Sequence, residues 1–108
     1  MKQSLKFEIE LDENHLPLDI QMEASNGAAS EDNIKALMIS AWEANKKETL
    51  RIDLWTKDMP VNEMFIMYYQ TMIAMANTLE RATGHEKLAG ALKDYCDFFA
   101  KETKIKEA

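Results

Sequence analysis

Polar and apolar residues alternate through the first part of the chain. Residues 5–11 place leucine, phenylalanine and isoleucine at every second position, with lysine and glutamate between them. The alternation resumes over residues 16–23, after a cluster of turn-forming residues at positions 12–15. A period of two residues is typical of strands with one buried face. The pattern therefore predicts a β-hairpin with its turn at residues 12–15.

A helical spacing replaces the alternation further along the chain. Residues 25–29 form a predicted loop, and Ser30 after them is a suitable N-cap for a helix. Apolar residues then recur at i, i+3, i+4, i+7 and i+8, which marks one face of a helix. These residues are Ile34, Leu37, Met38, Ala41 and Trp42. We therefore predict a helix that ends near residue 45.

Three further elements follow. Residues 50–55 alternate again and predict a third strand. Pro60 suits the first turn of a helix, and from there to about Ala82 apolar residues fill a broad arc. Gly84 readily adopts the left-handed conformation that ends a helix. A last helix carries, on its predicted buried face, Leu88, Leu92, Tyr95, Cys96 and Phe99.

These elements, in the order β-β-α-β-α-α, predict an α+β fold. A three-stranded, mostly antiparallel sheet of strand order 2-1-3 would have the helices packed on one face, and the last two helices would form an αα-hairpin. We expect a single domain over residues 1–108, with a frayed tail at about residues 104–108. The predicted core consists of Leu5, Phe7, Ile9, Leu18, Ile20, Leu37, Ala41, Leu50, Ile52, Leu54, Tyr68, Met72, Leu92 and Cys96.

The composition is that of a soluble protein. The 108 residues are 46% hydrophobic and 30% charged, and the one cysteine cannot form an internal disulfide. The alternating N-terminal residues lack the continuous apolar run of a signal peptide. The longest mostly apolar stretch, residues 64–76, is shorter than the roughly 20 residues that a membrane span needs. We therefore expect a cytoplasmic protein without a membrane span.

The formal net charge of −6 argues against two classes of partner. Proteins that bind phosphate groups normally collect lysine and arginine on one face. Here the largest basic groups, at residues 46–47 and in the C-terminal tail, are interspersed with glutamate. We expect neither nucleic acid nor an anionic membrane as a partner.

The spacing of titratable residues assembles no catalytic site. Cys96, the only thiol, has Asp94 and Asp97 beside it, and their charges disfavour the thiolate form. It also lies within the apolar arc of its helix, so we expect a core residue. The chain contains no Cys-x-x-Cys, His-x-x-x-His or Glu-x-x-His pattern and no glycine-rich phosphate loop. We therefore expect a protein that is not an enzyme and uses no metal or cofactor.

The solvent face of the predicted sheet is the first candidate for binding another protein. Arg51, Asp53 and Trp55 alternate along the third predicted strand and share this face with the charged residues of the hairpin. An exposed tryptophan among charged residues is a common anchor of protein interfaces. The acidic excess of this face favours a basic partner.

The helix predicted over residues 60–82 is the second candidate, because its apolar arc is wider than one sheet requires. Ile66, Met67 and Ile73 extend this arc and would bind a partner or, in a homodimer, a second copy of the chain. Methionine-rich helices can also line adaptable cavities. The alternative function is therefore the binding of a small apolar ligand, with an internal void beside Met64, Tyr68 or Met72.

Several segments carry a resemblance to a known family. Residues 49–64 read Thr-Leu-Arg-Ile-Asp-Leu-Trp-Thr-Lys-Asp-Met-Pro-Val-Asn-Glu-Met, and shorter matching segments lie at residues 69–71, 80–83 and 93–100. Together they resemble the gliding-motility protein GldC family of the Bacteroidetes. The resemblance implies an accessory protein of the gliding machinery, which is linked to type IX secretion, with a protein of that machinery as its partner. It implies no cofactor and no catalytic residue.

Overall fold

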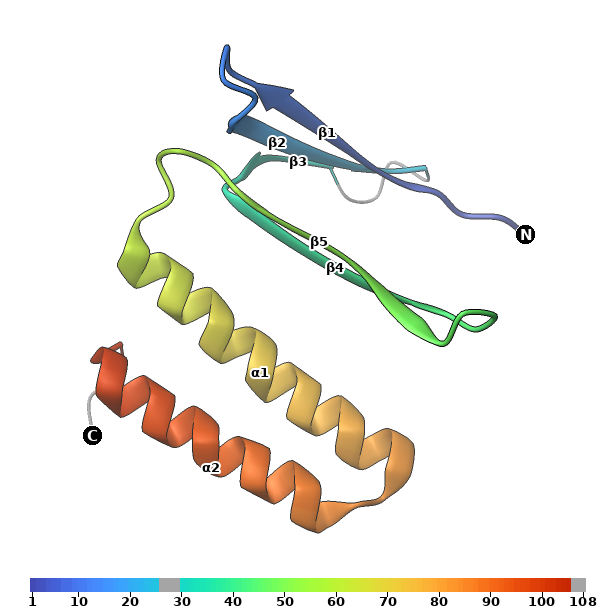
Figure 1. Ribbon diagram of the computed structural model, residues 1–108, viewed down its shortest axis with the longest axis vertical. Coiled ribbons are helices and arrows are strands. Elements are labelled where there is room, and N and C mark those ends of the chain that lie inside the picture. Colours follow the sequence, from blue (N-terminus) through green and yellow to red (C-terminus); the bar gives the residue numbers. More distant parts are fainter. Residues whose placement is uncertain (26–29, 106–108) are drawn as a thin grey trace. The chain divides into compact units, whose positions relative to one another are not determined.

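The computed structural model describes residues 1–25 and 30–105, and the chain divides into two compact units, Met1–Met59 and Pro60–Ala108. We call them the sheet unit and the helix unit (Figure 1). The sheet unit contains β1 (Leu5–Leu11), β2 (Pro17–Ala24), β3 (Ser30–Ile34), β4 (Ala36–Glu43) and β5 (Glu48–Trp55). The helix unit contains α1 (Val61–Thr83) and α2 (Glu86–Thr103). The predicted α+β class is confirmed.

Some predictions about organisation remain open. The loop predicted at residues 25–29 and the tail predicted at residues 104–108 lie mainly outside the described residues. The single domain and the packing of the helices on one face of a sheet stay predictions.

The first hairpin forms as predicted. Strands β1 and β2 pair antiparallel from Leu5 opposite Ala24 onward, so the alternating apolar residues share one face. Asp12 closes the turn, because its Oδ1 accepts hydrogen bonds from the backbone N–H groups of Asn14 (2.8 Å) and Leu16 (2.9 Å). His15 adopts a positive φ of 64° inside this turn. Asp12, a polar residue that can accept backbone hydrogen bonds within a turn, thus marked the position of the turn between the two alternating runs.

The helix predicted to end near residue 45 is wrong, because this segment forms β3 and β4. The apolar run at residues 36–42 fits a helical period and an alternating one equally well. An eight-residue antiparallel ladder with β5, from Ala36 opposite Trp55 to Glu43 opposite Glu48, decides between them. The predicted helix end is the hairpin turn, where the Glu43 carboxylate accepts a hydrogen bond from the Lys46 N–H at 2.7 Å.

The single three-stranded sheet of order 2-1-3 is also wrong. The strands form two antiparallel sheets, one of order β1-β2-β3 and one of β4 and β5. Strand β5 contains the predicted third strand, but its neighbour is β4, which the sequence pattern assigned to a helix. Each pairing joins strands that are close in sequence, so the sheets are built from local hairpins.

The two C-terminal helices form the predicted αα-hairpin. Helix α1 follows Pro60 and ends at Gly84, whose φ of 70° is the left-handed conformation that glycine adopts readily. At the start of α2, His85 Nδ1 accepts a hydrogen bond from the Leu88 N–H at 3.2 Å. The rings of Phe65 and Phe99 meet edge to face, with centroids 6.0 Å apart. Small buried side chains allow the two helices to pack closely: Ala76, Ala89, Cys96 and Ala100.

The predicted core is only partly buried. Ile20, Leu37 and Cys96 are buried, whereas Ile52 is 50% exposed and contradicts the prediction. The alternation of β5 is as predicted, but its neighbours are not, because a two-stranded sheet gives each side chain fewer contacts than a larger sheet. Predicted core residues that are half-buried are Phe7, Leu54, Met72 and Leu92. Those that are exposed are Leu5, Ile9, Leu18, Ala41, Leu50, Ile52 and Tyr68.

Candidate interaction surfaces

The β4–β5 sheet has two faces of different chemistry. Residues directly opposite each other on paired strands project to the same face. One face, the aliphatic face, carries Leu37, Ile39, Ala41, Leu50, Ile52 and Leu54. The opposite face, the tryptophan face, carries Ala36, Met38, Ser40, Trp42, Thr49, Arg51, Asp53 and Trp55.

Arg51, Asp53 and Trp55, singled out in the sequence, lie together on the tryptophan face. Arg51 Nη2 and Asp53 Oδ1 form an ion pair at 2.7 Å, and Trp55 is 53% exposed. This ion pair is exposed and neutral overall, so its contribution to stability is small. The tryptophan face therefore offers aromatic surface beside a fixed pair of opposite charges.

Trp42 is the residue that sequence reasoning missed. It lies on the same face, is 65% exposed, and is opposite Thr49 at the far end from Trp55. The two tryptophans are about 20 Å apart along the strands, at about 3.3 Å per residue. The sequence pattern had assigned Trp42 to the apolar face of a helix. The missed signal was the alternation of Met38, Ser40 and Trp42.

The charged residues of the first hairpin do not share this surface, which corrects the predicted single solvent face. They lie on the three-stranded sheet: Lys6, Glu8, Glu10, Asp19, Gln21 and Glu23. Lys6 and Glu8 form an ion pair at 2.8 Å. Their hydrogen bond is the largest cause that raises the pKa of Lys6 and lowers the pKa of Glu8. The acidic surface and the tryptophan face therefore belong to different sheets.

The three residues proposed on α1 do not form one patch. At about 100° per residue, Ile66 and Ile73 are about 20° apart around the helix, whereas Met67 is about 100° from Ile66. Ile66 is 37% exposed, and Met67 and Ile73 are half-buried. Met67 instead lines a groove on another side of α1.

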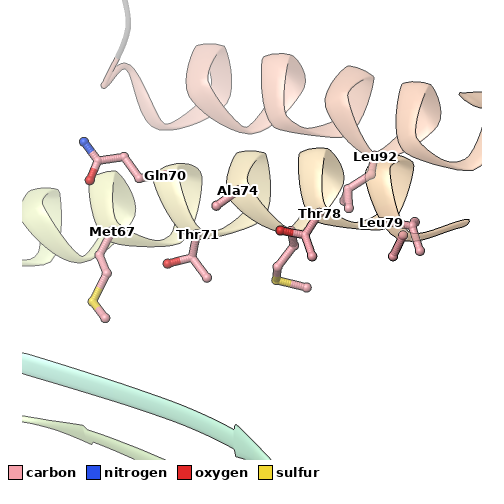
Figure 2. A pocket seen from close by; sticks show the side chains of 9 residues that line it. Met67, Gln70, Thr71, Ala74, Thr78, Leu79 and Leu92 are labelled. Carbon is pink, nitrogen blue, oxygen red and sulfur yellow. The ribbon is translucent and has the colours of Figure 1, made fainter. Parts of the chain in front are cut away.

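This groove is an apolar concavity of the helix unit, with a volume of about 760 Å³. Figure 2 shows Met67, Thr71 and Thr78 pointing to the same side of α1, with Leu92 reaching in from α2. The groove is open rather than an internal void, and Met64, Tyr68 and Met72 do not line it. It is lined by Met67, Gln70, Thr71, Ala74, Met75, Thr78, Leu79, Ala82 and Leu92.

The thiol of Cys96 lies in the interior of the helix unit. Its side chain is buried, and burial is the main cause that raises its pKa, followed by the charge of Asp97. The neutral thiol is therefore the dominant form at neutral pH. Within residues 1–25 and 30–105, no group of three or more histidine, cysteine, aspartate or glutamate side chains could hold a metal ion. In the same part of the chain, neither helix has the length and apolar character to cross a membrane.

The fold and these surfaces define a small α+β protein of two antiparallel sheets and a helical hairpin, with aromatic and aliphatic side chains exposed on both units. The chain belongs to the GldC-like family, described as gliding motility-associated protein GldC-like, whose model matches residues 17–105. This match confirms the resemblance carried by residues 49–64. No curated protein and no solved structure is significantly similar to the chain.

Proposed function

We propose that this protein is a non-enzymatic, cytoplasmic accessory of the gliding machinery that acts by binding another protein of that machinery. The tryptophan face carries the proposal. Trp42 and Trp55 are both more than half exposed on one face of a two-stranded sheet, with the Arg51–Asp53 pair between them. Tryptophan and arginine are the side chains most enriched among residues that dominate binding energy at protein interfaces.

The two faces of the β4–β5 sheet support different roles. A two-stranded sheet is marginally stable alone, so the aliphatic face with Ile39, Ile52 and Leu54 is suited to stabilising packing. The tryptophan face points in the opposite direction and carries charges that packing in a core would have to desolvate. It is therefore the better of the two for a reversible contact with a partner.

The environment of Cys96 supports a function other than catalysis. A nucleophilic cysteine needs a lowered pKa and access to substrate, whereas this thiol is buried and its pKa is raised. The membership in a gliding motility-associated family supports the assignment to the gliding machinery, and with it the link to type IX secretion.

Gliding cells that carry this protein provide the test. We expect Trp42→Ala and Trp55→Ala, introduced at the native locus, to reduce gliding speed and the yield of the partner cross-linked to the protein. Truncating an interface tryptophan costs about 2 kcal/mol or more of binding free energy, about thirtyfold in affinity. Phe98→Ala is the matched control, because Phe98 is also an exposed aromatic residue, at 58%, but lies in the helix unit.

Three outcomes would contradict the proposal. If deletion of the gene leaves gliding unchanged, the role in motility is wrong. If the tryptophan variants remain folded and both gliding and cross-linking match those of Phe98→Ala, the tryptophan face is not the contact. Cys96→Ala should glide normally, and a loss of gliding with normal protein levels would instead indicate chemistry at the thiol.

The groove on α1 favours a second candidate function, the binding of a small apolar ligand. Its volume of about 760 Å³ lies in the range of ligand sites, and Met67, Met75 and Leu79 give it a flexible apolar lining. Native mass spectrometry of the protein purified from its own cells would detect a retained lipid or other apolar molecule. Ala74→Leu, which fills the groove, should then abolish retention, whereas the protein alone at its sequence mass would count against this function.

A further inference from the structure

Residues 56–59, between β5 and α1, are fastened to the turn of the first hairpin. The backbone N–H of Lys57 donates a hydrogen bond to the Pro17 carbonyl at 3.1 Å, and Lys57 Nζ forms an ion pair with Asp12 Oδ2 at 2.9 Å. Asp12 uses its other oxygen, Oδ1, to accept the N–H groups of Asn14 and Leu16. One carboxylate therefore closes the β1–β2 turn and holds Lys57 at the same time.

The same residues are also fastened to the junction between β3 and β4. The Thr56 N–H donates to the Lys35 carbonyl at 2.7 Å, and Lys35 Nζ forms an ion pair with Asp58 Oδ2 at 2.9 Å. The Thr56 hydroxyl donates to Asp58 Oδ1 at 2.7 Å. Thr56 is buried, and no side-chain polar atom buried in the described part of the chain lacks a hydrogen-bond partner.

These bonds lie where the chain passes between the two sheets of the sheet unit. Lys35 is the one residue between β3 and β4, and each of those strands belongs to a different sheet. Asp12 precedes β2 of the first sheet, and residues 56–58 directly follow β5 of the second. We propose that Thr56, Lys57 and Asp58 form a strap that holds the two sheets together at this corner. This inference is independent of the proposed function.

The strap works through several weak bonds made by three consecutive residues. Each ion pair is partly exposed and by itself contributes little to stability. Once one bond holds the segment, however, the others form with a smaller further loss of backbone entropy. The Met59 N–H donates a hydrogen bond to the Thr56 carbonyl at 3.1 Å, so the bonded segment extends to the residue before Pro60.

Amide hydrogen exchange on the full chain, measured residue by residue, tests the strap. Asp12→Asn removes the charge but keeps an oxygen for the turn, and Lys57→Met removes the charge but keeps the aliphatic stem. We expect the protection factors of amides 56 and 57 to fall about threefold in either variant. Thr56→Val, which removes a buried hydroxyl without changing its shape, should lower them about tenfold. Lys6→Met is the matched control, because the Lys6–Glu8 pair lies within one strand.

The double variant Asp12→Asn/Lys57→Met makes the test specific. If the two residues act as one bond, the double variant loses no more protection at amides 56 and 57 than either single variant. Losses that add independently would overturn the strap. An equal loss in Lys6→Met, or a loss spread evenly over β1 to β5, would also overturn it, because either result indicates a change in overall stability.

Discussion

Phe99 and Phe98 are neighbours in sequence with opposite environments, which makes them a test of the helical hairpin. Phe99 is half-buried and its ring contacts three others, with centroids 6.0 Å from Phe65, 6.5 Å from Tyr68 and 6.3 Å from Tyr95. Phe98 is mostly exposed, and its ring contacts Tyr95 at 5.9 Å. The same substitution at the two positions therefore removes very different amounts of packing.

The magnitudes follow from burial and ring contacts. Full burial of a large apolar side chain is worth about 1.5–3 kcal/mol, and an aromatic pair adds about 0.5–1.5 kcal/mol. The three contacts of Phe99 share one ring and do not add fully, so we expect Phe99→Ala to lower the free energy of unfolding by about 3 kcal/mol. We expect Phe98→Ala to lower it by about 1 kcal/mol or less.

Urea denaturation can follow the two units separately. Both tryptophans of the chain, Trp42 and Trp55, lie in the sheet unit, so their fluorescence reports on that unit alone. Far-ultraviolet circular dichroism is dominated by α1 and α2. Phe99→Ala should shift the dichroism transition to lower urea, and a matching shift in fluorescence would show that the two units unfold together. Equal or larger destabilisation by Phe98→Ala would refute the assignment of Phe99 to the helix interface.

Three further predictions use other features of the structure. The pKa of Asp12 is lowered chiefly by Lys57, and that of Asp58 chiefly by the Thr56 hydroxyl. The stability that these two carboxylates contribute is complete above the unfolded pKa of about 4 and is lost as pH falls through their lower folded values. Asp12→Asn should therefore flatten the acid side of a fluorescence-monitored stability profile, and an unchanged slope would contradict this. Gly84→Ala, at φ 70°, should lower the free energy of unfolding by about 1 kcal/mol. Gly90→Ala, inside α2 and with open space at its Cβ, should raise it by about 0.5–1 kcal/mol. Thermal melts that reverse this order would contradict the left-handed conformation of Gly84. Cys96 should react with a thiol reagent only as fast as the helix unit opens, so rapid labelling of the native protein at neutral pH would contradict its burial.

The sequence pattern predicted correctly those elements whose apolar residues fit only one periodicity, either that of a strand or that of a helix. Residues 5–24 alternate around a turn closed by Asp12, and α1 is bounded by Pro60 and Gly84. The run at residues 36–42 fits the periodicity of a strand and that of a helix, because its apolar residues are nearly continuous. Its structure is decided by pairing with β5, and a partner strand is not visible in the run itself. Because this run was assigned to a helix, the number of strands and sheets was predicted wrongly, and so were some of the core residues.

The candidate surfaces were predictable to different degrees. The shared face of Arg51, Asp53 and Trp55 was predictable from the alternation along one strand. This alternation does not depend on which strand is the neighbour in the sheet. The position of Trp42 on the same face was not predicted, because its segment was assigned to a helix. The groove was not predicted, because its lining includes small residues such as Thr71, Ala74 and Thr78, which do not stand out in a pattern of large apolar side chains.

The segment at residues 49–64, which carries the strongest resemblance to the family, contains residues with two kinds of explanation. Thr56, Lys57 and Asp58 have their polar groups engaged within the sheet unit, so the fold alone accounts for their chemistry. Trp55, one residue earlier, is more than half exposed and stands opposite only Ala36 across the ladder. The exposed part of this tryptophan contributes nothing to the stability of the sheet unit, since apolar area is stabilising only when it is removed from water. Leu50, Ile52 and Val61 of the same segment are also half or more exposed, but Trp55 is its only aromatic residue. Its exposure supports the proposed contact with a partner, and the strap that follows it fixes the end of its strand.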